Sequence, residues 1–503
     1  MPEPLPPTPE PEPGPQIEIV PSENLPGPMR EFRGIWAATV ANIDWPSRSN
    51  LSTAQQQAEL VAMMDRAVQG GFNAIVFQVR PVADALYASE LEPWSEYLAG
   101  REGRAPDPFY DPLELAVELA HERGLELHAW VNPYRAGHPA FAGPHASSHI
   151  SNTRPDLVRR YGDYLWLDPG EPEAAEHSLA VITDIVRRYD IDGIHLDDYF
   201  YPYPVQRNGR DVPFPDADSY RRAQEAGETL GRGDWRRQNV DTFIHRLYDL
   251  VKAEKPHVKV GISPFGIWRP GNPEGITGFD QFGRLYADAR KWQQEGWLDY
   301  LAPQLYWAID SRGQSFPKLL NWWGEQNTAD RHLWPGLYDS RMLPEVGGYE
   351  LAEIPNQVEL VRENEVATGT IHFSEKALRP ENGPLGDRLG RGLYADRALV
   401  PASPWLVEAP PAAPDLLVVP TASGRSLMLI PGAGTLEVAT VPHLWVVRTQ
   451  TDGVWTWDLV EGETSNVELA DDVSAVAVSA IDRTGNEGPA AVLSLEPESA
   501  SGR

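Results

Sequence analysis

Cysteine is absent from the 503 residues, which excludes disulfide bonds, a thiol nucleophile and cysteine-ligated zinc. No apolar stretch approaches the roughly 18 residues that a membrane-spanning helix needs. Basic residues are scarce, with 43 Lys and Arg against 73 Asp and Glu, so the formal net charge is −30. Binding to nucleic acid or to an anionic membrane surface requires clustered cations, and this balance argues against both.

Aromatic residues, in contrast, are plentiful, with 17 Trp and 18 Tyr. Such rings stack on the apolar faces of sugars, but they also fill protein cores, so composition alone leaves a carbohydrate substrate open. The chain is long enough for a barrel-sized domain and one smaller domain.

The first segment, residues 1–27, begins with MPEPLPPTPEPEPGP. It is too rich in Pro and Glu to build a core and predicts a disordered, extended linker. A tether of this kind often separates an enzyme from a wall or membrane anchor. We therefore expect an exported protein of the cell envelope or the extracellular space, with a signal segment or lipid anchor on its full-length form. A disordered cytosolic tail is the alternative.

Residues 28–406 alternate strand-like and helix-like stretches. Eight strands are predicted, at 32–38, 74–80, 125–132, 192–198, 258–264, 300–306, 333–338 and 370–374. Between them lie amphipathic helices, such as residues 240–251 with apolar side chains at i, i+3, i+4 and i+7. This pattern predicts an α/β fold of the (β/α)₈ TIM-barrel class. A doubly wound sheet is the competitor, but no Gly-rich phosphate loop follows the first strand.

Residues 412–497 have a different texture, with short alternating strands and no helical period. They predict a small all-β sandwich. The closing AVSAIDRTGNEGP resembles the last hairpin of a fibronectin type III module.

The side chains that face the barrel axis can be deduced from alternation, because the outward set must be apolar. In GIHLDD, Ile194 and Leu196 are apolar, so His195 and Asp197 face inward. Asp198 is out of phase unless the strand has already turned into its loop. Because a carboxylate is costly to bury without a role, Asp197 is the favoured catalytic residue.

The same test places hydrogen-bonding and aromatic side chains at the ends of other strands, where barrel enzymes have their sites. These include Gln78, Arg80, His128, Trp130, Asn132, Gln304, Tyr306, His372 and Ser374. The alternative is an inert polar layer inside the barrel. Individually, the histidines could be core residues, Trp36, Trp45 and Trp307 could be sugar platforms or packing, and Arg135 could bind a substrate carboxylate or an internal one.

Several motifs in the same order, FRGIWAATVANIDWPS, NAIVFQVRP, HAWVNPYR, DGIHLDDYFYP and PQLYW, closely resemble the glycosyl-hydrolase-like family ten proteins of bacterial envelopes. The resemblance covers residues 29–406. It implies a glycosidase-like barrel, with some members acting on peptidoglycan strands whose stem peptides have been removed, and with lipid-anchored or secreted members. The resemblance does not identify the catalytic residues of this chain.

Two broader likenesses concern DGIHLDDY. It resembles the fourth-strand motif of family 18 chitinases, which would align Asp197 with the aspartate that steadies the substrate acetamido group. The catalytic glutamate of that motif falls on Tyr199, which cannot easily replace it as a proton donor. IHLD also resembles the fourth strand of amylase-like barrels, whose aspartate is the nucleophile. Both likenesses converge on Asp197.

Glycoside hydrolysis normally uses two carboxyls. We expect Asp197 to be the nucleophile or to stabilise the oxocarbenium ion, and Asp198 or Glu375 to be the acid, ahead of Asp310 and Asp44. A substrate N-acetyl group could also supply the nucleophile. The substrate is expected to be a polysaccharide, and no metal or cofactor is predicted. The candidate substrate-binding residues are Trp36, Asp44, Trp45, Arg80, His128, Asn132, Arg135, His195, Tyr199, Gln304, Tyr306 and Trp307.

Two other functions remain open at this point. One is a non-catalytic, carbohydrate-binding barrel in which the sandwich is a second adhesive module. The other is a metal-dependent hydrolase that uses His195 with the Asp197–Asp198 pair.

Overall fold

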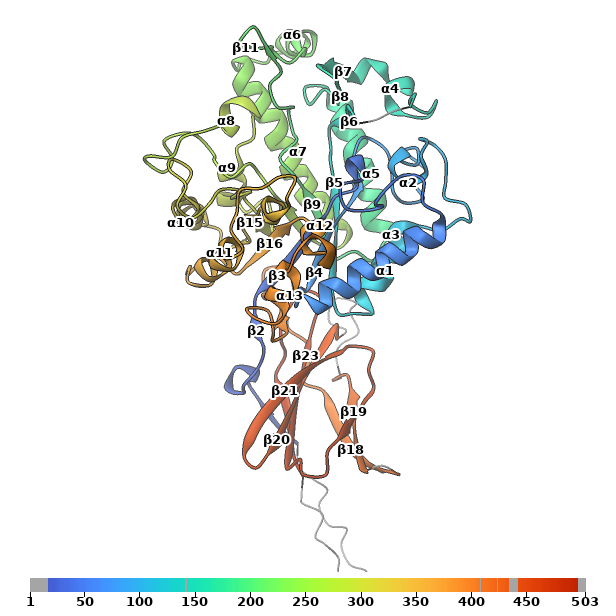
Figure 1. Cartoon of the computed structure of the whole chain (residues 1–503), viewed down its shortest axis with the longest axis vertical. Helices are drawn as coiled ribbons and strands as arrows, with labels where there is room; N and C mark the ends of the chain where they lie inside the picture. The colour runs from blue at the N-terminus through green and yellow to red at the C-terminus, as the bar shows by residue number, and fades with distance from the viewer. Residues whose placement is uncertain (1–16, 141–142, 408, 423, 434–441, 496–503) are drawn as a thin grey trace, which may run out of the picture. The chain divides into compact units, whose positions relative to one another are not determined.

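The computed structural model describes residues 17–140, 143–407, 409–422, 424–433 and 442–495. The chain divides into two compact units (Figure 1). One comprises Met29–Pro401, and the other combines Met1–Pro28 with Ala402–Arg503. The division therefore falls close to the predicted barrel, residues 28–406, but it assigns the N-terminal segment to the C-terminal unit.

Parallel strands form the centre of the larger unit. In chain order they are β3 (Phe32–Ala37), β4 (Ala74–Arg80), β5 (Glu126–Val131), β9 (Gly193–Leu196), β12 (Lys259–Ile262), β13 (Tyr300–Leu301), β14 (His332–Leu333), β15 (Gly336–Leu337) and β16 (Gly369–Phe373). They pair in the order β14-β13-β12-β9-β5-β4-β3-β16-β15.

The two outermost strands of that order close the sheet. β14 and β15 are pieces of one short segment, interrupted at Trp334 and Pro335 because proline cannot donate to the ladder. One piece pairs with β13 and the other with β16. The predicted (β/α)₈ barrel is thus confirmed, and each predicted barrel strand contains or overlaps an observed one.

Helices follow the barrel strands and surround the sheet (Figure 1). The main ones are α1 (Thr53–Gln69), α3 (Pro112–His121), α5 (Pro172–Arg188), α7 (Arg232–Glu254), α9 (Ala289–Gln294), α10 (Phe316–Gln326), α11 (Glu353–Arg362), α12 (Glu375–Leu378) and α13 (Leu385–Gly390). Asp111 caps α3, since its side chain accepts a hydrogen bond from the Leu113 amide at 3.0 Å. The predicted apolar stripe of α7 is buried from Val240 to Val251.

Shorter elements belong to the loops of the same unit. They are β2 (Met29–Arg30), paired with β17 (Ala398–Leu399), and α2 (Glu96–Ala99), β6 (Arg135–Gly137), α4 (Ile150–Thr153), β7 (Val158–Tyr161), β8 (Tyr164–Leu167), β10 (Gln206–Arg207), β11 (Arg210–Asp211), α6 (Ala217–Glu225) and α8 (Gln281–Arg284). The excursion after β5 carries the three-stranded sheet β6-β8-β7, and the excursion after β9 carries the hairpin β10–β11 and α6.

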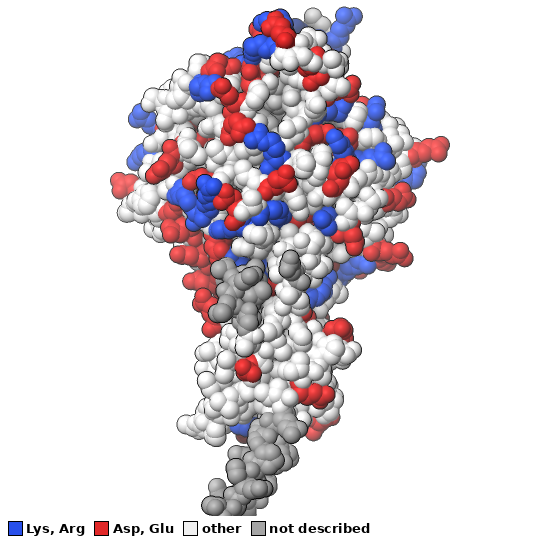
Figure 2. Space-filling model, turned by 180° about the vertical axis from the view of Figure 1, so that it is seen from behind, with Lys and Arg blue, Asp and Glu red and all other residues white. Residues whose placement is uncertain are grey.

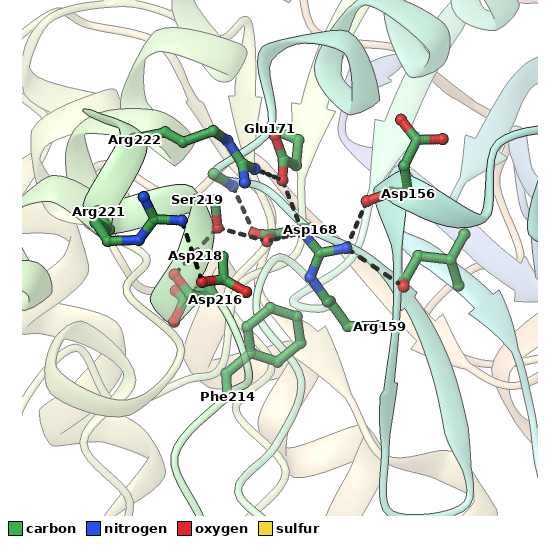
Figure 3. Close-up of polar contacts among 12 residues, drawn as sticks. Asp156, Arg159, Asp168, Glu171, Phe214, Asp216, Asp218, Ser219, Arg221 and Arg222 are labelled. Carbon is green, nitrogen blue, oxygen red and sulfur yellow. Dashed lines mark hydrogen bonds and ion pairs between the residues drawn. The ribbon is translucent and has the colours of Figure 1, made fainter. Parts of the chain in front are cut away.

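An ionic cluster fastens these two excursions to each other (Figure 3). Asp168, which follows β8, accepts a hydrogen bond from the Ser219 hydroxyl of α6 at 2.7 Å and lies 3.1 Å from the Arg159 guanidinium. Glu171 pairs with Arg159 at 2.7 Å and also with Arg222 of α6. The cluster therefore restrains the segment that runs from β9 to α6.

The second unit is built from two antiparallel sheets. The larger has the order β1-β24-β23-β20-β21 and the smaller β18-β19-β22. Their bounds are β1 (Ile17–Val20), β18 (Asp415–Thr421), β19 (Gly424–Ile430), β20 (Leu444–Thr451), β21 (Val454–Glu461), β22 (Asn466–Leu469), β23 (Ala475–Ile481) and β24 (Ala490–Ser494). Buried side chains from both sheets, including Leu427 and Trp445, form one core. The all-β region is as predicted, while its membership of the fibronectin type III class stays a prediction.

The N-terminal segment corrects part of the predicted linker. Residues 17–20 form β1, which pairs with β24 in the register Ile17 to Leu493. Ile17 and Ile19 alternate with Glu18, a strand pattern that the Pro- and Glu-rich residues before them hid. Residues 1–16 of the predicted linker lie outside the described part of the chain.

Charges of both signs are interspersed over the face of the barrel unit seen in Figure 2. Among the described helices, none combines the length and the apolar character needed to cross a bilayer.

Candidate active site

A pocket of about 310 Å³ lies where the barrel strands end. Its lining residues come from segments that are far apart in the sequence. They are Trp36, Ala38, Val40, Ile43, Trp130, Arg135, His138, Asp197, Asp198, Tyr199, Tyr203, Ser263, Gln304, Tyr306, Tyr338 and Phe373. The parallel order of the barrel therefore gathers seven of the predicted site residues at one rim: Trp36, Arg135, Asp197, Asp198, Tyr199, Gln304 and Tyr306.

Asp197 follows β9 and is held through both carboxylate oxygens. The amide nitrogen of Asn132, at the end of β5, donates to Oδ1 and to Oδ2 at 2.7 Å each. The pKa of Asp197 is raised, because the effect of burial outweighs the nearby Arg135 charge and the Asn132 hydrogen bond, which both lower it. The charged form thus has a fixed orientation and a cation beside it.

Asp198 is the second carboxyl of the pocket, and its Oδ2 accepts a hydrogen bond from the hydroxyl of Tyr203. Burial and the charge of Asp197 raise the pKa of Asp198 to about 7, against the opposing effect of hydrogen bonds from Tyr203 and Gln304. Burial raises the pKa of both adjacent carboxyls, but the Arg135 charge opposes this rise at Asp197, whereas the charge of Asp197 adds to it at Asp198. A proton shared by the pair therefore favours Asp198.

One wall of the pocket combines a cation with a neutral hydrogen-bond donor. The Arg135 guanidinium lies 4.8 Å over the ring of Tyr199. Burial and the Arg135 charge lower the pKa of His138 to about 4, so its imidazole is neutral. Because His138 Nδ1 accepts from the Ala140 amide at 3.1 Å, its proton is on Nε2.

His195 lies beneath the pocket, with no exposed surface. Its Nε2 is 3.1 Å from the indole nitrogen of Trp36 and 2.9 Å from the Ser263 hydroxyl, and its Nδ1 is 2.9 Å from the Tyr300 hydroxyl. These partners give His195 an internal supporting position, and its predicted contact with substrate stays a prediction. Since both ring nitrogens have protein partners, His195 offers no ligand atom alongside Asp197 and Asp198.

Two other predicted substrate contacts, Asp44 and Trp45, belong to a loop and have protein partners. Asp44 is buried and accepts hydrogen bonds from the Ala38 amide and the Ser374 hydroxyl, each at 2.7 Å. Trp45 is buried against Phe77, with ring centroids 5.3 Å apart. Alternation along the strands could not reveal these loop conformations.

Arg80 and His128 face the barrel interior as alternation predicts, but protein partners saturate them. Arg80 forms a two-pronged ion pair with Glu92 at 2.8 and 2.5 Å. His128 lies between the Tyr300 hydroxyl and the carboxylate of Glu126, at 2.8 and 2.9 Å. Neither lines the pocket, and both have the internal partners that the inert-layer alternative describes.

The predicted alternative acids also lie elsewhere. Glu375 is buried between two guanidinium groups, Arg66 at 2.9 Å and Arg379 at 2.8 Å, and does not line the pocket. Asp310 is exposed. Trp307 packs its edge against Phe265, with centroids 5.5 Å apart, outside the pocket lining.

The sequence analysis did not single out several pocket residues. They are Tyr203, Ser263, His138, Tyr338 and Phe373. Ser263 was within reach of the alternation argument, because it follows Gly261 on the inward face of β12. Tyr203 and His138 belong to loops, for which period-two alternation gives no direction.

One group outside the pocket has metal-ligand residue types. Glu102, His145 and His149 bring ligand-type atoms within 4.8 Å of one another. However, the two imidazoles are stacked at 4.2 Å, and His149 Nδ1 accepts from the Ser151 amide at 3.1 Å, which leaves the proton on Nε2. His149 then donates to the Val82 carbonyl at 3.2 Å. This arrangement fits a hydrogen-bonded cluster better than a metal site.

Aromatic rings complete the pocket. Tyr306 lies between Tyr338 and Phe373, with centroids 4.7 and 5.9 Å away. Rings, a cation, neutral donors and two unlike carboxyls at the carboxyl end of a (β/α)₈ barrel form a site suited to sugars and to glycosidic-bond cleavage. The fold and the site therefore indicate a glycoside hydrolase of the barrel class.

Comparisons with known proteins agree with this class. Residues 31–344 match the family model Glycosyl hydrolase-like 10. The glycosyl hydrolase YngK of Bacillus subtilis (strain 168) is 40% identical over 413 residues, which cover 80% of this chain and 79% of that protein. The glycosyl hydrolase DigH of Escherichia coli (strain K12) is 33% identical over 317 residues, covering 58% and 70%.

Among solved structures, the catalytic domain of a beta-amylase from Paenibacillus polymyxa aligns with 73% of this chain and 98% of its own. Its TM-score is 0.48, and the aligned sequences are 14% identical.

The extent of the family match and the identity to YngK establish the assignment. The chain belongs to the glycosyl hydrolase-like 10 family and is a glycoside hydrolase.

Proposed function

We propose that the chain hydrolyses a glycan of the bacterial cell envelope, with peptide-free peptidoglycan strands or a related N-acetylated polysaccharide as its substrate. The observation that carries this proposal is the pair of unlike carboxyls, Asp197 and Asp198, in a pocket lined with aromatic rings.

Asp198 is the general acid of this mechanism. A pKa of about 7 leaves a large share of Asp198 protonated near neutral pH, so it can protonate the departing glycosidic oxygen. The nearby Asp197 charge supports this proton because two adjacent carboxyls resist being ionised together. After departure of the leaving group, the Asp198 carboxylate can take a proton from the attacking water.

Asp197 acts as a fixed anion. Because Asn132 bonds to both of its oxygens, it is better placed to stabilise positive charge than to form a covalent bond. With an N-acetylated sugar, the acetamido carbonyl oxygen attacks the anomeric carbon, and Asp197 accepts a hydrogen bond from the acetamido N–H. The positive charge that develops on that group then lies beside the carboxylate.

Arg135 is the pocket residue that suits the lactyl carboxylate of a muramic acid unit. It lines the pocket and lies over the Tyr199 ring. A chain with net charge −30 repels an anionic glycan at long range, but salt screens this repulsion beyond about 8–10 Å. Recognition is therefore decided locally by Arg135. A protein that acts on such a substrate would work in the cell envelope or outside the cell.

The test is incubation with peptide-free peptidoglycan strands, intact peptidoglycan and chitin oligomers, with the products read by mass spectrometry. Cleavage of peptide-free strands in preference to intact peptidoglycan is expected. Cleavage of chitin oligomers alone would keep the N-acetyl chemistry but reject the lactyl group as a determinant. Release of products only from polymers without N-acetyl groups would overturn the proposal.

A further inference from the structure

A column of hydrogen-bonded side chains runs through the barrel beneath the pocket. It starts at the ion pair between Lys259 Nζ and Glu126, at 2.7 Å, and continues from Glu126 to His128 at 2.9 Å. The Tyr300 hydroxyl then joins His128 to His195, at 2.8 and 2.9 Å. All five residues are buried.

Two glycines make room for this column. A Cβ atom at Gly193 would lie 2.6 Å from Nδ1 of His128, and one at Gly261 would lie 1.8 Å from the ring of Tyr300. Substituting a larger residue at either position would displace a ring of the column, so the strands β9 and β12 are adapted to it.

The donors and acceptors of the column fix a single proton arrangement. The Trp36 indole can only donate, so Nε2 of His195 accepts and the His195 proton is on Nδ1. That proton is donated to the Tyr300 oxygen, and the Tyr300 hydroxyl therefore donates onward to Nδ1 of His128. The His128 proton is on Nε2 and points to the Glu126 carboxylate.

Ser263 connects this proton arrangement to the pocket. Its hydroxyl lies 2.9 Å from the same accepting Nε2 of His195 and 3.4 Å from the Leu196 carbonyl. Both neighbours are acceptors, so the Ser263 proton points away from the pocket. The Ser263 oxygen then presents lone pairs to the pocket that it lines.

We propose that Ser263 is a specificity-determining residue that accepts a hydrogen bond from a sugar hydroxyl or amide N–H, and that His195 and Tyr300 are positioning residues that keep it an acceptor. The proposal rests on the proposed function for its substrate, but the proton arrangement can be measured without one. Burial and the neighbouring His128 lower the pKa of His195, which keeps its imidazole neutral and its Nε2 free to accept.

The direct test is ¹⁵N NMR of the histidine-labelled protein without substrate, with His195 assigned by its absence from the His195→Asn variant. The expected spectrum shows His195 protonated on Nδ1. Protonation on Nε2, or on both nitrogens, would overturn the proposal whatever the protein cleaves. A correct tautomer with no glycan cleavage would instead leave the column in place and reject the proposed function.

Kinetics test the effect on the pocket. Ser263→Ala should raise KM about three- to tenfold, the range expected for one neutral hydrogen bond, with kcat nearly unchanged. Tyr300→Phe removes the oxygen that accepts the His195 proton, and it should raise KM by a similar factor. The double variant should match the single variants, since both act through one contact.

The matched control is Tyr134→Phe, which removes another buried hydroxyl, one without a hydrogen-bond partner among the described residues. It should leave KM unchanged. An equal KM for Tyr300→Phe and the control, or additive effects in the double variant, would contradict the role assigned to the column. If Tyr300→Phe does not fold, the proposal is tested by the tautomer of His195 and by the KM of Ser263→Ala.

Discussion

The amide of Asn132 donates to both oxygens of the Asp197 carboxylate, each at 2.7 Å. The orientation of that amide is itself fixed, because Gln78 donates to the Asn132 oxygen at 2.7 Å. The Gln78 oxygen in turn accepts from the backbone amides of Thr39 and Val40, both at 2.9 Å. A string of amides therefore runs from the loop after β3 to the carboxylate after β9 and sets its position.

Replacing Asn132 tests this string. Asn132→Ala removes the hydrogen bonds that lower the pKa of Asp197 and orient it, so kcat should fall about a hundredfold. Steady-state kinetics on peptide-free strands measure the loss. Asn321→Ala, which removes an exposed amide on α10, serves as the control and should retain full activity. A kcat for Asn132→Ala close to that of the control would mean that Asp197 needs no fixed orientation.

The hydroxyl of Tyr203 should control the pH range of activity. Its hydrogen bond stabilises the charged form of Asp198, so Tyr203→Phe should raise the pKa of Asp198 above about 7. Because the acid must be protonated, the alkaline limb of kcat/KM should move to higher pH. Tyr220→Phe, whose hydroxyl bonds to the Leu230 carbonyl at 2.7 Å, should leave the limb in place. A shift to lower pH in Tyr203→Phe would assign the limb to another group.

The ion pairs that tie the start of α6 to α7 should matter for stability. Asp216, just before α6, is buried and accepts from Arg236 through Nε at 2.7 Å, with Arg232 as a second partner. Asp216→Asn leaves those guanidinium groups without their charge partner, so it should destabilise the fold by about 3 kcal/mol.

Asp218, on the same helix, is the matched control because it is exposed and only loosely paired with Arg221 at 3.5 Å (Figure 3). Asp218→Asn should change the free energy of unfolding by about 0.5 kcal/mol or less. Denaturant titration of the two variants compares them, and equal stabilities would show that the ion pairs of Asp216 are not stabilising.

A variant of Glu375 tests whether this carboxylate stabilises the fold or takes part in catalysis. Glu375→Gln removes the carboxylate that Arg66 and Arg379 share. Since Glu375 does not line the pocket, the variant should lower the melting temperature while glycan turnover by the folded fraction stays within about twofold of wild type. A loss of turnover without a loss of stability would restore Glu375 as a candidate acid.

The barrel was predictable because its strands are short, apolar on their outward faces and separated by regular helices. Alternation in GIHLDD correctly directed Ile194 and Leu196 outward, and it selected Asp197 for the pocket. Asp198 reaches the same pocket because β9 ends at Leu196, so both carboxyls belong to the loop. Alternation alone allows this exception but cannot decide it.

Alternation gives the direction of a side chain but not its depth along the strand. His128, on β5, and Asn132, just after it, both point inward. His128 is bonded to Glu126 at the start of the strand, whereas Asn132 donates to Asp197 in the pocket. Partners such as Glu92 for Arg80 come from loops, in this case the loop that follows the same strand. A pairing of that kind depends on the tertiary fold, which explains why saturated cations resembled substrate contacts in the sequence.

The central claim is that Asp198 donates the proton and Asp197 does not. The most direct measurement compares Asp198→Asn with Asp197→Asn on two substrates, a natural N-acetylated glycan and an aryl N-acetylglycoside whose leaving group needs no proton. On the glycan, Asp198→Asn should lose about a thousandfold in kcat/KM, but on the aryl glycoside it should lose far less. Asp197→Asn should lose activity on both substrates alike. Equal losses for Asp198→Asn on the two substrates would contradict its role as the general acid.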